Sequence, residues 1–291
     1  MTMTPTAPAR PAKTRPAIVE GICVALFWLS SLLAAPSYAA ERSQVSAFLE
    51  VTGFDVAIAS IAQSAGDAPG MLGAEASDFG LAWERLASDV FDPEKMQDMA
   101  VDILEQTLSR DALLHAAEFY ASDLGQRLVE AENISHQREE GESRREIGED
   151  MVAEMQATGD PRISLFHRMN TAIGGTDSAL RAVQEIQFRF LMAASAAGLV
   201  EMQFDADGLR AMMKAQEDEM RRAMNASNLA HSAYTYRDFS VDELRDYVAA
   251  LEDPVMQEVY ALLNAVQYEI QANRFEELAH RMRGLQPVQE L

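Results

Sequence analysis

The chain has 291 residues, with 46 acidic and 24 basic side chains and a formal net charge of −22. Such an excess of negative charge repels phosphate backbones, and no basic stripe offsets it, so we expect no nucleic-acid partner. The single cysteine, Cys23, lies near the N-terminus. The rest of the chain therefore has no disulfide and no thiolate metal site, and its fold must depend on a hydrophobic core.

The N-terminal stretch has the layout of a secretory signal peptide. Three basic residues precede an apolar run at residues 21–35, and the small residues Ser37 and Ala39 then occupy the −3 and −1 positions of a cleavage site. The run is shorter than the roughly 20 residues that a membrane-spanning helix needs. We therefore predict that residues 1–39 are a cleaved signal peptide, that the protein is periplasmic, and that no stable membrane span is left after cleavage.

The remaining sequence has the periodicity of amphipathic helices. Met96, Met99, Ala100 and Ile103 follow the i, i+3, i+4, i+7 spacing of one helical face, and most later segments repeat this pattern. No stretch alternates between apolar and polar residues with the β-branched enrichment of a strand. The sequence therefore predicts an all-α fold.

Charged residues dominate residues 138–150, which we interpret as the join between two halves. The prediction is two tandem helical-hairpin units after the signal peptide, at residues 40–140 and 141–291. The last helix should run without interruption from about Pro254 to Arg283, because it contains no internal proline or glycine.

Several helix starts can be read from capping residues. Ser109, Ser240 and Asp253 each stand just before a periodic run, where a side-chain oxygen can accept a hydrogen bond from the first turn. Ser240 and Glu243 also have the spacing of a capping box.

An internal repeat relates the two predicted units. Offset by 131 residues, residues 108–133 align without a gap over residues 239–264, with Ser109 over Ser240. The identities are few, but the apolar stripe and both helix starts coincide. Each copy reads as a short capped helix, a corner and a longer helix, which is an αα-hairpin. A single hairpin cannot bury its apolar face alone, so the copies should share cores with flanking helices.

The corner of the first copy carries the most distinctive residues of the chain. They are Phe119, Tyr120, Ser122, Asp123, Gly125 and Gln126. This F-Y-x-S-x-x-G pattern after an acidic-capped helix resembles the signature of the bacterial domain of unknown function 2059, over about residues 95–135. The resemblance implies an exported helical protein and implies no activity.

We interpret this corner as structural. Ser122 aligns with Asp253 in the second copy, and aspartate can replace a serine as a helix cap but not as a nucleophile. Asp123 then lies in the first helical turn, where the helix dipole favours an anion. Gly125 lacks a Cβ, so we expect the ring of Phe119 or Tyr120 to lie close to it.

Other candidate chemistry is weak. The five histidines include no i, i+4 pair, and His115 has only Glu118 at a metal-ligand spacing. Methionine pairs such as Met212 and Met213 could bind Cu(I), but they fall mostly on apolar stripes, where methionine fills irregular gaps. We expect no metal, no cofactor and no catalytic residue, and the protein is not predicted to be an enzyme.

The leading functional hypothesis is therefore a non-catalytic envelope protein that binds a protein or peptide partner through helical grooves. The alternative is a carrier of an apolar or lipidic ligand in a cavity between methionine-rich helices. A continuous cavity of a few hundred Å³ would favour the carrier, and an exposed apolar groove would favour the partner. Convergent buried carboxylates with a histidine would instead favour an unrecognised hydrolase.

Overall fold

The helical periodicity of the sequence is realised as helices in every described part of the chain. The structure is a computed structural model that describes residues 41–74, 79–136, 141–202 and 205–284, and these ranges contain no strand. The all-α prediction is confirmed. The predicted signal peptide at residues 1–39 lies outside the described residues.

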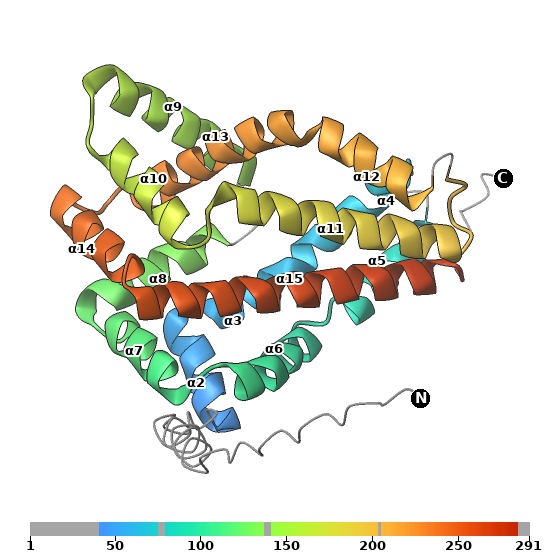
Figure 1. Cartoon of the computed structure of the whole chain (residues 1–291), viewed down its shortest axis with the longest axis horizontal. Helices are drawn as coiled ribbons and strands as arrows, with labels where there is room; N and C mark the ends of the chain where they lie inside the picture. The colour runs from blue at the N-terminus through green and yellow to red at the C-terminus, as the bar shows by residue number, and fades with distance from the viewer. Residues whose placement is uncertain (1–40, 75–78, 137–140, 203–204, 285–291) are drawn as a thin grey trace, which may run out of the picture. The chain divides into compact units, whose positions relative to one another are not determined.

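The helices are labelled as in Figure 1. In chain order they are α2 (Arg42–Thr52), α3 (Phe54–Ser60), the 3-10 helix η2 (Ile61–Asp67), α4 (Ala68–Met71), α5 (Leu81–Val90), α6 (Pro93–Thr107), α7 (Arg110–Tyr120), α8 (Asp123–Ser135), α9 (Gly141–Thr158), α10 (Arg162–Ala172), α11 (Gly175–Ala196), α12 (Ala206–Ala215), α13 (Glu217–Thr235), α14 (Val241–Leu251) and α15 (Pro254–Met282).

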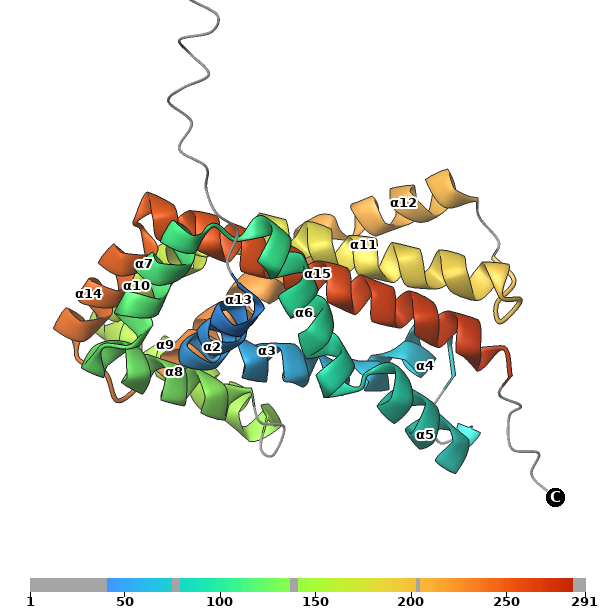
Figure 2. The ribbon, with the colours of Figure 1, turned by 90° about the horizontal axis from the view of Figure 1, so that it is seen from below.

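Helix α15 organises the packing. Its apolar residues recur every three or four positions, and Val259, Leu263, Val266 and Ile270 are all buried. One side of α15 packs along α11, and other positions pack against α5, α6 and α7. Figure 1 shows α11 above α15 and α6 and α7 below it, and α11 and α15 remain side by side in Figure 2. The predicted uninterrupted last helix is therefore confirmed, and it ends one residue before Arg283.

An aromatic cluster joins segments from the two predicted units. The ring of Phe275 in α15 lies 5.3 Å from that of Phe91, after α5, and 5.4 Å from that of Phe190 in α11, and both contacts are edge-to-face. This is a favourable geometry for aromatic pairs. Residues before and after position 140 therefore share one hydrophobic core. The division into two units stays a prediction about the organisation of the sequence.

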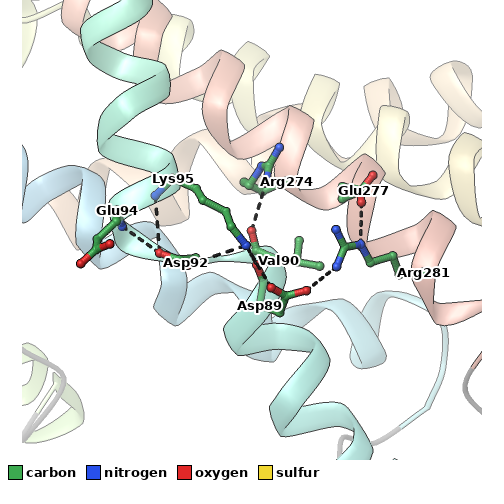
Figure 3. Close-up of polar contacts among 8 residues, drawn as sticks. All are labelled: Asp89, Val90, Asp92, Glu94, Lys95, Arg274, Glu277 and Arg281. Carbon is green, nitrogen blue, oxygen red and sulfur yellow. Dashed lines mark hydrogen bonds and ion pairs between the residues drawn. The ribbon is translucent and has the colours of Figure 1, made fainter.

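Polar contacts tie the start of α6 and the end of α5 to the second half of α15 (Figure 3). Asp89 accepts a hydrogen bond from Nζ of Lys95 at 2.9 Å and also pairs with Arg281 of α15. Arg274 donates to the carbonyl oxygen of Val90 at 3.3 Å, at the end of α5. Exposed ion pairs contribute little free energy, so the buried aromatic cluster beside them supplies most of this attachment.

The helix bounds follow the internal repeat. Helices α7 and α14 begin and end at positions 131 residues apart, and α8 and α15 begin 131 residues apart. Both pairs have the predicted order of a short capped helix, a corner and a second helix. The copies diverge after the corner, since α8 ends at Ser135 whereas α15 continues to Met282.

The predicted cap residues occupy N-cap positions. Ser109 accepts a hydrogen bond from a backbone N–H of α7 at 3.2 Å, Ser240 accepts one from α14 at 3.3 Å, and Asp253 accepts two from α15, at 2.8 and 3.3 Å. Glu243 completes the capping box by accepting from the backbone N–H of Ser240 at 2.8 Å. Each of these side chains satisfies a donor that has no partner within its helix.

Among the described residues, no single helix has both the length and the hydropathy of a membrane span. Helix α2 and the segment Phe54–Met71 reach those limits only together, as a pair bent by 81°. Val45, Phe48 and Leu49 of α2 are buried in the core.

Replacing Glu243 should weaken the protein in a pH-dependent way. Hydrogen bonds from Ser240 and from Arg127 lower the pKa of Glu243 to about 2. Because this pKa lies below the unfolded value, the carboxylate stabilises the fold above about pH 4.5, and the effect is lost as the pH falls towards about 2. We expect Glu243→Gln to lower the melting temperature at pH 7 by roughly 2–4 °C, as for a lost cap of about 1 kcal/mol.

Thermal melts monitored by circular dichroism between pH 2 and pH 7 test this expectation, with Glu258→Gln on the exposed face of α15 as a charge-matched control. If Glu243→Gln lowered the melting temperature equally at pH 2 and pH 7, the assigned role of the carboxylate would be contradicted.

Candidate functional site

The corner between α7 and α8 is held by hydrogen bonds between the side chain of Ser122 and the backbone. Oγ of Ser122 accepts from the backbone N–H of Gly125 at 3.1 Å and donates to the carbonyl oxygen of Phe119 at 2.6 Å. His115, which could serve as a base, instead lies 3.1 Å from Asp253, the cap of α15. Ser122 is thus the N-cap of α8, and both hydrogen bonds of its hydroxyl are made within the corner.

Gly125 is required by a close approach of two backbones. A Cβ at this position would lie 2.3 Å from the carbonyl oxygen of Phe119 and 2.6 Å from Cα of Tyr120. Our prediction that an aromatic ring occupies this space is wrong, because it is the last turn of α7 that approaches. Helix α8 turns back across that end at backbone distance, so any side chain at residue 125 would force the two backbones apart.

Two further polar residues of the corner, Asp123 and Gln126, are exposed and, among the described residues, interact only with nearby backbone. Asp123 lies in the first turn of α8, where the partial positive charge of the helix N-terminus favours an acid. Nε2 of Gln126 donates to the carbonyl oxygen of Ala121 at 3.3 Å, a further bond across the corner.

The corner should respond differently to two substitutions. We expect Gly125→Ala to lower the free energy of unfolding by about 1–3 kcal/mol, because the added methyl group overpacks a backbone contact. Ser122→Asp should be tolerated, since aspartate also caps helices, whereas Ser122→Ala should cost about 1 kcal/mol. Urea denaturation of the three variants measures these changes, and a Ser122→Asp protein that fails to fold would refute the capping role.

The aromatic residues of the corner face the interior. The ring of Phe119 stacks on Tyr247 of α14, with centroids 5.9 Å apart and planes inclined by 5°. The hydroxyl of Tyr120 contacts that of Tyr260 in α15 and lies 3.4 Å from that of Tyr247. The corner thus supports a cluster of tyrosines drawn from α7, α14 and α15.

This cluster borders a cavity of about 860 Å³. The cavity lies between α8, α10, α11, α13, α14 and α15, and its wall combines aliphatic, amide and phenolic side chains. Its tyrosines are Tyr236, Tyr247, Tyr260 and Tyr268, its aliphatic residues include Ile173, Val183, Ile186 and Leu251, and its amides include Asn170, Asn228, Asn264 and Gln271.

Glu132 is one of two carboxylates among the described residues that line this cavity, with Glu185. One of its oxygens, Oε1, accepts hydrogen bonds from the hydroxyls of Tyr236 and Tyr247, at 2.7 and 2.8 Å. Burial raises the pKa of Glu132, and the two tyrosine hydroxyls oppose that shift. Among the described residues no lysine or arginine forms a salt bridge with it. The carboxylate is therefore held by neutral donors and has no counter-ion among the side chains that the structure describes.

Two histidines also line the cavity. Burial lowers the pKa of His136, the C-cap of α8, and that of His231 in α13, and for His231 the nearby His136 and Arg144 lower the pKa further. Nε2 of His231 lies 3.5 Å from Oγ of Ser135. Both imidazoles are therefore neutral at pH 7 and can act as hydrogen-bonding groups.

Glu132 is a site residue that was not predicted from the sequence. A signal for it was present, because Gly125, Leu128 and Val129 form the buried face of α8 and Glu132 continues that spacing. An acidic residue on an apolar stripe is unusual. The tyrosines that surround it come from distant positions, and only the tertiary fold brings them together.

Comparison with known proteins confirms the resemblance seen in the sequence. Residues 94–157 match the model of a family described as "Uncharacterized protein conserved in bacteria (DUF2059)". These residues are called the DUF2059 segment for their similarity to that family. No curated protein and no solved structure matches it.

The DUF2059 segment spans α6, α7, α8 and nearly all of α9, and so extends beyond residue 135. It includes the corner and Glu132, whereas Tyr236, Tyr247 and Tyr260 lie outside it.

Within the described ranges, no group of three or more His, Cys, Asp or Glu side chains is placed to hold a metal ion. Of the paired methionines, Met96 and Met155 are buried in the core, whereas Met212 is 44% exposed.

Removing the charge of Glu132 should stabilise the unliganded protein at neutral pH. The pKa of Glu132 in the folded protein lies above its value in the unfolded chain. The wild-type protein therefore loses stability as the pH rises from the unfolded pKa to the folded pKa, whereas the glutamine variant does not. We expect Glu132→Gln to equal the wild type near pH 4 and to melt at least about 2 °C higher at pH 7. Melting curves across this range, with Glu130→Gln on the exposed face of α8 as a control, provide the measurement. A Glu132→Gln protein that is less stable than wild type only at pH 7 would reverse the predicted sign.

Proposed function

We propose that this chain is an exported, non-catalytic binding protein that holds a small amphiphilic ligand in the cavity between α8, α10, α11, α13, α14 and α15. The observation that carries the proposal is the cavity itself. Its volume of about 860 Å³ lies within the range of roughly 300–1,000 Å³ typical of small-molecule sites. A wall that is mostly apolar with a few converging polar groups is also typical of such sites.

The composition of the wall refines the carrier hypothesis. The sequence suggested a cavity between methionine-rich helices, but Met169 is the one methionine among the described lining residues. Tyrosine and amide side chains take the place of the expected thioethers. A ligand that fits this wall has an apolar body and at least one hydrogen-bonding group, because the wall combines aliphatic with polar side chains.

The protein-partner hypothesis has less support. Among the described residues, the exposed large apolar side chains belong to six different helices; they are Leu81, Leu114, Ile134, Ile147, Met212 and Val255. Scattered exposed apolar residues are ordinary on protein surfaces. The cavity is therefore the stronger basis for a function.

A binding role also suits the chemistry better than a hydrolytic one. Glu132 is hydrogen-bonded to tyrosine hydroxyls rather than to an imidazole, and Ser122 is used as a helix cap. General acid–base catalysis needs a proton donor or acceptor within reach of a nucleophile or a base.

The proposal includes the predicted organisation of the chain. Removal of residues 1–39 as a signal peptide would deliver the protein to the periplasm. The repeated bounds of α7–α8 and α14–α15 support two copies of one hairpin. In this proposal the first copy contributes Glu132, and the second contributes Tyr247 and Tyr260.

Filling the cavity should abolish ligand binding. The probe is N-phenyl-naphthylamine, an uncharged dye at neutral pH whose emission rises in apolar surroundings. We expect saturable binding to the wild type and at least tenfold weaker binding to Ala182→Trp, because Ala182 of α11 lines the cavity and is partly buried, so that an indole there would take up cavity volume. Ala249→Trp on the exposed face of α14 is the matched control. Equal binding to both tryptophan variants would refute the cavity as the binding site.

A further inference from the structure

We propose that the ligand carries a protonated amine whose N–H groups donate to the second carboxylate oxygen of Glu132. This inference rests on the proposed function, since it names the chemical class that the same cavity would take. It is carried by the arrangement of hydrogen bonds and charges around one side chain.

The two oxygens of Glu132 are in different situations. Oε1 accepts from both Tyr236 and Tyr247, whereas Oε2 makes no hydrogen bond to any described residue. Although Oε2 has no hydrogen-bond partner among those residues, it is not fully buried. Since Glu132 lines the cavity, this oxygen is open to it. Glu132 is partly buried, and an acceptor of this kind that opens into a cavity can be completed by a donor from a ligand.

Among the described residues, no lysine or arginine forms an ion pair with this carboxylate, and Arg144, whose charge acts on His231, donates to the carbonyl oxygen of Ile134 at 2.7 Å. Arg181 of α11 lines the cavity, but it is exposed and donates to Ser178. Glu185, the other carboxylate of the wall, lies 4.0 Å from Arg210. The two cavity histidines, whose lowered pKa values keep them neutral, add no charge at pH 7. A cationic ligand would therefore provide the missing counter-ion, and an anionic ligand would place two like charges in one recess.

The surroundings of Glu132 suit an ammonium group with an apolar body. Tyr236, Tyr247 and Tyr260 bring aromatic rings to the same part of the cavity, and aromatic faces attract cations. Ile173 and Ile186 provide aliphatic surface for the remainder of the ligand. The net charge of −22 also raises the concentration of cations near the protein.

A set of ligands with one tail and three head groups tests the inference. Octylammonium, octanol and octanoate are each titrated by calorimetry at pH 7 and physiological salt into the full exported chain. We expect octylammonium to bind at least tenfold more tightly than octanol, and octanoate to bind most weakly. Glu132→Gln should weaken octylammonium at least tenfold and leave octanol unchanged. Glu130→Gln, with the same loss of charge on the exposed face of α8, should change neither.

The outcomes separate the two proposals. Equal affinity for the three ligands, or a preference for octylammonium that persists in Glu132→Gln, would overturn the amine inference and leave the cavity as a binding site. The persistent preference would then reflect general attraction of cations to an acidic protein. Failure of all three ligands to bind would overturn the binding function itself, and the amine inference with it.

Discussion

Burial of α15 on more than one side is the constraint on which the rest of the structure depends. A helix of 29 residues packs along α11 and also against α5, α6 and α7, so its apolar positions must serve several neighbours. Phe275 shows this most clearly, because its ring contacts Phe91 from one half of the sequence and Phe190 from the other. Without disulfides, cohesion of this kind is what joins distant helices, at roughly 25 cal/mol per Å² of buried apolar area.

The same helix contributes to a region that is not optimised for stability. Tyr260 of α15 belongs to the tyrosine cluster, and Glu132 sits beside that cluster with a pKa raised by burial. A carboxylate without a counter-ion destabilises the folded state. Strained or costly polar groups of this kind tend to mark functional positions. The stacking of Phe119 on Tyr247 connects this region to the corner between α7 and α8, which gives the corner a role in supporting the cavity wall.

The sequence was most informative where the physics is local. The N-caps at Ser109, Ser122, Ser240 and Asp253 depend only on residues two or three positions away, and all four occupy those positions in the structure. The need for a small residue at Gly125 was also foreseeable, but the partner was not. Whether a ring or a backbone fills the space depends on how α8 crosses α7. The cavity was anticipated only as an alternative, and its methionine lining was not found.

The sequence by itself determined the helical fold class, the last long helix, the capped corners and the resemblance that the DUF2059 match confirms. These follow from periodicity and from hydrogen bonds within a few residues. Tertiary structure alone decided that Glu132 meets Tyr236 and Tyr247, more than a hundred positions away, and that one carboxylate oxygen stays open to a cavity. The physical reason is that such an encounter depends on the angles at which whole helices pack, and no local pattern encodes those angles.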